Sequence, residues 1–145
     1  MSEGERQEQR WAVLYDRDCG FCMWLLAGLL RWDRASRLRP IALQRPEADH
    51  LLADLEPAER MASWHLISPG GKRRSGGAAL PPLLRLLPGG HVPAAAFAQF
   101  PGLTDCGYRW VAAHRSQLSR WVPKRAKERA SELVRRCAQA RGSRC

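Results

Sequence analysis

Two cysteines stand three residues apart in the segment YDRDCGFC, residues 15–22. Such a pair can carry redox chemistry, provide half of a zinc site, or consist of two small buried side chains. A thiol attacks a disulfide only as its thiolate, and the unpaired N–H groups at the start of a helix favour that negative charge. A long apolar run follows the pair and predicts a helix that begins at Cys19 or Gly20 and ends near Arg31. Cys19 would then lie at the helix start, with Cys22 one turn further in.

The redox interpretation gives each cysteine a step. Cys19 attacks a substrate disulfide, and Cys22 then resolves the mixed disulfide and releases the reduced substrate. We expect Cys19 to be exposed and acidic and Cys22 to be sheltered. The cysteine pair itself carries two electrons, so no bound cofactor is expected. Asp16 is predicted either to accept a proton from Cys22 or to fix the turn through backbone N–H groups, and Asp18 to cap the helix.

A zinc site is the first alternative, and it needs about four ligands, usually in two close pairs. The chain has one close cysteine pair; Cys106, Cys137 and Cys145 are scattered, and the four histidines form no ligand-like pair. No metal ligand is therefore assigned. The second alternative is a pair of inert core cysteines, and redox chemistry is favoured over both.

The chain has 145 residues, which is the size of one domain with a real hydrophobic core. Residues 1–10 are polar, lack the apolar stretch of a secretory signal, and are expected to form a disordered tail. The longest apolar run, residues 19–30, is much shorter than the roughly 20 residues that span a bilayer. We therefore expect a soluble, cytoplasmic protein, in a compartment where a cysteine pair is more often catalytic or metal-binding than structural.

The net charge of +10 is concentrated near the C-terminus. Residues 124–145 hold eight Lys and Arg against two Glu. Residues 123–145 are predicted to form a basic tail, helical or disordered, that is dispensable for folding. Such a tail could contact nucleic acid or another anionic partner, although no aromatic residues are interleaved for stacking. A second class of function is therefore a non-catalytic binding module that uses this tail.

The remaining elements surround the cysteine pair in a definite order. Residues 11–15 (WAVLY) and 37–44 (RLRPIALQ) predict strands on either side of the cysteine helix, which implies a parallel pair with a right-handed crossover. Pro40 favours an edge position or a bulge. Next come short helices from Pro46 and Pro57 and a hairpin around PGGK. They are followed by a helix over residues 80–87, a loop with a helical turn over residues 88–103, and a helix over residues 104–121. This order predicts an α/β fold with a thioredoxin-like mixed sheet over residues 11–122, flanked by helices, with additional C-terminal helices.

The segments YDRDCGFC, RLRPIALQ, RSGGAAL and YRWVAAHR together resemble the DCC family of predicted thiol-disulfide oxidoreductases, over about residues 11–122. The most specific part is the core formed by Asp16, Cys19 and Cys22. The resemblance implies a thioredoxin-like fold, thiol–disulfide exchange, and a protein or small-molecule thiol or disulfide as substrate. Tyr108, Trp110 and Arg115 match the second motif of the family, and the two aromatic residues are predicted to be core residues.

The chain departs from the usual pattern of this family and of thioredoxins in several places. Arg17 stands where the family usually has glycine, so it would be strained if the turn needs a positive φ, and it would place a cation near Cys19. The segment beyond Pro123 has no counterpart in the family. Thioredoxins carry a proline before the third strand, but residues 60–63 contain none. The surface that docks the substrate is therefore expected to differ.

Overall fold

A computed structural model describes residues 2–140 and contains one mixed sheet with the strand order β2-β1-β3-β4. β1 pairs with β2 in parallel and with β3 antiparallel, and β3 pairs antiparallel with β4. The strands are β1 (Trp11–Tyr15), β2 (Leu38–Ala42), β3 (His65–Ile67) and β4 (Arg73–Ser75). This is the thioredoxin-like α/β arrangement that the order of elements predicts.

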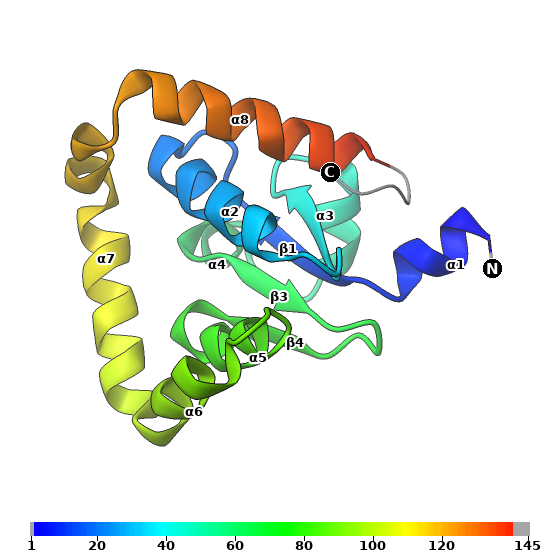
Figure 1. Cartoon of the computed structure of the whole chain (residues 1–145), viewed down its shortest axis with the longest axis horizontal. Helices are drawn as coiled ribbons and strands as arrows, with labels where there is room; N and C mark the ends of the chain where they lie inside the picture. The colour runs from blue at the N-terminus through cyan, green and yellow to red at the C-terminus, as the bar shows by residue number, and fades with distance from the viewer. Residues whose placement is uncertain (1, 141–145) are drawn as a thin grey trace.

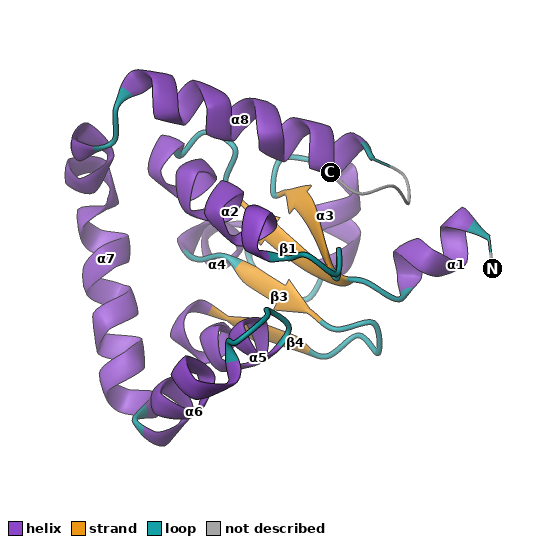
Figure 2. Cartoon of the chain, viewed as in Figure 1, coloured by secondary structure: helices purple, strands orange, loops and turns teal. Residues whose placement is uncertain are grey.

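Helices surround the sheet, and α7 and α8 frame it on two sides (Figures 1 and 2). A short 3-10 turn, Gly76–Ala79, leads from β4 into the helices that follow. The helices are α1 (Glu3–Glu8), α2 (Gly20–Trp32), α3 (Pro46–Leu51), α4 (Pro57–Ala62), α5 (Leu80–Arg85), α6 (His91–Gln99), α7 (Pro101–Trp121) and α8 (Lys124–Gln139).

Strand β1 is central and is buried on both faces. Val13 and Tyr15 belong to a large apolar cluster that also contains side chains of α2, α5 and α8. Ala12 and Leu14 point to the opposite face, into a smaller cluster that includes Leu52. Because successive side chains of a strand alternate between faces, a strand with helices on both sides must be apolar throughout, as this one is.

The connection from α2 to β2 is held by a buried carboxylate. Asp33 caps the end of α2, and its two carboxylate oxygens accept hydrogen bonds from the backbone N–H groups of Arg37 (3.0 Å) and Leu38 (2.8 Å). β2 then runs parallel to β1 at the edge of the sheet. Pro40 has no backbone N–H to donate, and an edge strand tolerates this because one of its sides has no partner strand.

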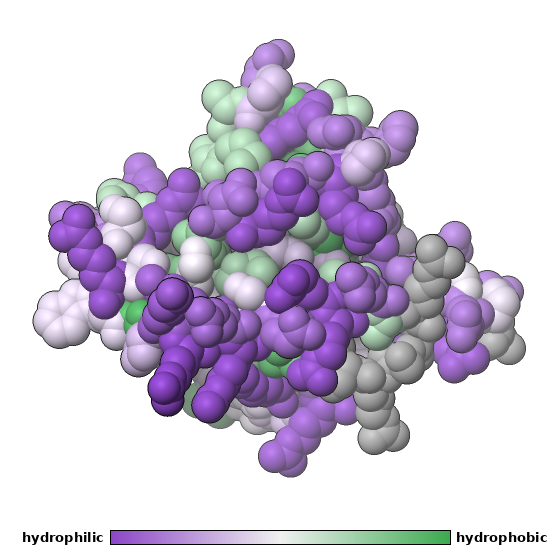
Figure 3. Space-filling view, turned by 90° about the horizontal axis from the view of Figure 1, so that it is seen from above, coloured by the Kyte–Doolittle hydropathy of each residue, from purple (hydrophilic) through white to green (hydrophobic). Residues whose placement is uncertain are grey.

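The basic segment after Pro123 differs from the expected dispensable tail. It forms α8, which lies along α2, and its Ala130, Val134 and Cys137 are buried in the same apolar cluster as β1. Apart from half-buried Lys127, the charged residues of α8 are exposed. Hydrophilic side chains predominate on the face of the molecule seen from above (Figure 3). α8 is therefore an amphipathic helix, with one face buried in the core and its charges mainly on the face toward solvent.

Three further expectations differ from the structure. Within the segment expected to be a disordered tail, α1 forms, closed by a capping box in which Ser2 and Glu5 bond to each other's backbone N–H groups. Residues 88–103 contain the nine-residue helix α6 rather than a loop with a single helical turn, since its alanines favour a helix. Trp110, expected in the core, is 57% exposed.

In the described part of the chain, no helix is long and apolar enough to cross a membrane.

Candidate active site

The cysteine pair lies where the chain leaves β1 and enters α2. Cys19 is the N-cap residue of α2, with extended backbone angles (φ −96°, ψ 102°). Its Sγ accepts a hydrogen bond from the backbone N–H of Cys22 at 3.3 Å. The two residues are joined by a disulfide, with their Cα atoms 5.2 Å apart. The sulfur of Cys19 therefore occupies the place of a capping oxygen, next to the unpaired N–H groups of the first turn.

This arrangement corrects two expectations. Asp18 does not cap the helix, because Cys19 takes that position. Cys19 is not fully exposed as expected, since Cys19 and Cys22 are both half-buried.

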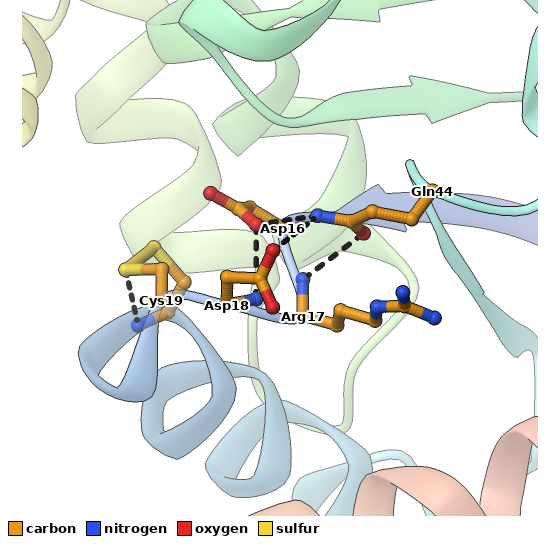
Figure 4. Close-up of a disulfide and its surroundings, with 6 residues drawn as sticks. Asp16, Arg17, Asp18, Cys19 and Gln44 are labelled. Carbon is orange, nitrogen blue, oxygen red and sulfur yellow. Dashed lines mark hydrogen bonds between the residues drawn. A yellow bond between two sulfur atoms is a disulfide. The ribbon is translucent and has the colours of Figure 1, made fainter.

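Asp16 organises the turn that precedes the cysteines. Its Oδ1 accepts hydrogen bonds from the backbone N–H of Asp18 (3.0 Å) and from the side-chain amide of Gln44 (2.8 Å) (Figure 4). The same amide also donates to Asp18 Oδ2 at 3.4 Å, and Gln44 Oε1 accepts from the backbone N–H of Arg17 at 3.4 Å. A carboxylate that binds the N–H two residues ahead is the usual way in which Asp holds a turn.

Gln44 is a site residue that sequence reasoning missed. It follows β2, whose carboxyl end lies beside that of β1 because the two strands are parallel. The backbone N–H of Leu43 donates to the carbonyl of Tyr15 at 2.8 Å, which extends this pairing to the edge of the turn. The parallel β1–β2 pair predicted from the sequence could have pointed to Gln44, since residues that follow neighbouring parallel strands meet at one edge of the sheet.

Arg17 does not act as expected. Ser36 is the non-glycine residue with a positive φ in the described chain, so Arg17 is not strained there. Its side chain extends away from the Cys19 sulfur, on the Gln44 side of the turn (Figure 4). The Arg17 charge acts on Tyr15 instead: burial raises the pKa of the Tyr15 hydroxyl, while the charges of Arg45 and Arg17 oppose that rise.

The segment that precedes β3 reaches the same edge of the sheet, because β3 is antiparallel to β1 and pairs His65 with Leu14. Tyr108 of α7 anchors this segment. Burial raises the pKa of the Tyr108 hydroxyl, and its hydrogen bonds to the Trp64 backbone and the Ser63 side chain oppose the rise.

Gly76 makes room for the Tyr108 ring. Its φ is +59°, and a Cβ built there would lie 3.0 Å from a ring carbon of Tyr108. Glycine is therefore required at this position both for the backbone conformation and for the approach of the ring. Half-buried Tyr108 thus packs against the segments that flank β3 and β4, in contrast to exposed Trp110.

The remaining cysteines have surroundings different from those of the pair. Cys106 is an exposed free thiol on α7, and Cys137 is buried on α8. Cys145 lies outside the described residues. Among residues 2–140, no group of three or more His, Cys, Asp or Glu side chains is placed to hold a metal ion.

The described chain thus combines a mixed thioredoxin-like sheet with a disulfide-bonded cysteine pair at the start of its first long helix. The model of the DCC1-like thiol-disulfide oxidoreductase family matches residues 13–121. The chain belongs to this family. No curated protein and no solved structure matches it significantly.

Proposed function

We propose that this protein is a thiol-disulfide oxidoreductase in which Cys19 is the attacking thiol and Cys22 the resolving thiol. One observation carries the proposal: Cys19 is the N-cap of α2 and is within disulfide distance of Cys22 one turn further on. The N–H groups and the macrodipole of the helix stabilise a thiolate at that position.

The exchange proceeds in two balanced steps. In the reduced protein, the Cys19 thiolate attacks one sulfur of a substrate disulfide, forms a mixed disulfide and expels the other substrate sulfur as a thiolate. Cys22 then loses its proton to solvent and attacks the Cys19 sulfur, which gives the Cys19–Cys22 disulfide and the second substrate thiol. Two electrons pass from the protein to the substrate, and a thiol reductant restores the pair.

In this proposal Asp16 is a positioning residue. Its Oδ1 already accepts two hydrogen bonds, from Asp18 and Gln44, which fix the turn that presents Cys19. We favour this role over proton acceptance from Cys22. The substrate is a protein or small-molecule thiol or disulfide in a reducing, cytoplasmic environment, and the cysteine pair needs no further cofactor.

The order of alkylation tests the proposal. An ordinary thiol has a pKa near 8.5, and thiols at helix starts commonly titrate between about 3.5 and 7.5. When the reduced protein is treated briefly with iodoacetamide at pH 6 to 7, Cys19 should be labelled well before Cys22, Cys106, Cys137 and Cys145. Peptide mapping identifies the labelled sulfur, and Cys19→Ser should lose the fast phase. Labelling of exposed Cys106 as fast as Cys19 would favour a non-catalytic binding module instead.

A further inference from the structure

Lys127 of α8 lies against the start of α2. A Cβ built on Gly20, the residue after Cys19, would lie 3.1 Å from Cδ of Lys127, 3.6 Å from its Cε and 3.7 Å from its Cγ. The aliphatic part of the lysine therefore runs across the first residue of α2. The absence of a side chain at Gly20 leaves the space that this approach uses.

The ammonium group of Lys127 is one bond beyond Cε, so it lies close to the same helix start. Lys127 is half-buried, unlike Lys124 and Arg125 of the same turn, which are exposed. Within residues 2–140, no carboxylate forms an ion pair with Lys127. The aliphatic stem of Lys127 thus packs on α2, and its ammonium group has no acidic partner among the described residues.

This position is electrostatically unusual, because the N-terminus of a helix carries a partial positive charge and repels cations. A lysine there becomes favourable when an anion shares the site. The group on the α2 N-cap that can become anionic is the Cys19 thiol, which loses its proton in the reduced protein.

We propose that Lys127 stabilises the thiolate of Cys19 and so is a positioning residue for the redox pair, supplied by a helix beyond residue 121, where the family match ends. This inference rests on the proposed function of Cys19. Stabilising the thiolate increases the fraction of nucleophile at neutral pH. It also stabilises the reduced pair, which makes the couple a stronger oxidant.

The expected effect is modest because Lys127 is partly exposed to solvent. A nearby positive charge lowers the pKa of a thiol, and solvent screening reduces that shift. Lys127→Gln should therefore raise the pKa of Cys19 by about 0.5 to 1 unit. Lys127→Arg keeps the charge and should restore most of the original value.

The test is the pH dependence of Cys19 alkylation in the full-length reduced protein, read by mass spectrometry for the wild type and three variants. Arg125→Gln is the matched control, since it removes one positive charge from the same turn, about 160° away around the helix. We expect Lys127→Gln to raise the pKa of Cys19 while Lys127→Arg and Arg125→Gln leave it nearly unchanged.

The outcomes separate this inference from the proposed function. An acidic Cys19 in the wild type with the same pKa in Lys127→Gln overturns the role of Lys127 and leaves the oxidoreductase proposal in place. Equal shifts in Lys127→Gln and Arg125→Gln also overturn it, because they would reflect net charge alone. An ordinary pKa for Cys19 in the wild type overturns both.

Discussion

Replacing Val134 with alanine tests whether the basic helix α8 is part of the folded core. Val134 is 0% exposed and packs in the cluster that contains Val13 and Tyr15 of the central strand. A dispensable tail would tolerate this change without loss of stability. A core helix would lose packing on one of its most buried side chains.

The magnitude follows from the two methyl groups that the substitution removes. Each buried methylene-sized group contributes about 0.8 kcal/mol of transfer free energy, so the loss is about 1.6 kcal/mol. The residual cavity adds to this loss, and the better helix propensity of alanine offsets about 0.5 kcal/mol. The net destabilisation is about 2 kcal/mol, which lowers the melting temperature of a chain of this size by about 4 to 8 °C.

Urea unfolding followed by tryptophan fluorescence measures this change. Arg135→Ala is the control on the same helix: Arg135 is exposed and pairs with Glu132 at 2.9 Å, an interaction worth about 0.2 to 0.5 kcal/mol. Val134→Ala should move the midpoint several times further than the control. Equal, small effects of the two substitutions would show that α8 does not pack as the structure has it.

Two other predictions concern charge. Arg17→Gly should leave the pKa of Cys19 unchanged, because the Arg17 side chain points away from the sulfur; a rise of more than about half a unit in a thiolate titration would contradict this geometry. Burial lowers the pKa of His65, an effect that the charge of Arg73 assists and the Arg60 carbonyl opposes. The folded state then favours neutral His65, so the stability it contributes is present above about pH 6.5 and is lost as the pH falls. Unfolding free energies measured from pH 7.5 to 5 should decrease, and His65→Gln should flatten that decrease; parallel curves would assign it to other groups.

The central part of the fold was predictable because its signals are local. An unbroken apolar run specified β1, and the apolar residues after Gly20 specified α2, within one residue of its observed end. Pro40 correctly indicated an edge position for the second strand. The cysteine pair then fell at the strand-to-helix junction, so its placement needed only these local elements.

The role of α8 was hidden by its charge. Ala130, Val134 and Cys137 are spaced by four and three residues, which is the period of one helix face. Two of these side chains are small, and the eight basic residues of the segment dominate its composition. The periodicity was therefore a better guide than the net charge.

The surroundings of the cysteines depend on tertiary contacts that spacing does not reveal. Gln44 reaches Asp16 across 28 residues of sequence, and Lys127 reaches Gly20 from the other end of the chain. The direction of the Arg17 side chain follows from the turn that Gln44 and Asp16 fix. Proximity in sequence alone placed Arg17 beside Cys19, and the structure separates them.

Trapping of the mixed-disulfide intermediate distinguishes the attacking thiol, Cys19, from the resolving thiol, Cys22. Reduced Cys22→Ser protein is exposed briefly to a small disulfide such as oxidised glutathione and then mapped by mass spectrometry. We expect a stable mixed disulfide on Cys19, while Cys19→Ser traps little and the wild type proceeds to its internal disulfide. A mixed disulfide distributed over Cys106 and the other thiols, with Cys19 no more modified than they are, would contradict the assignment of Cys19 as the attacking thiol.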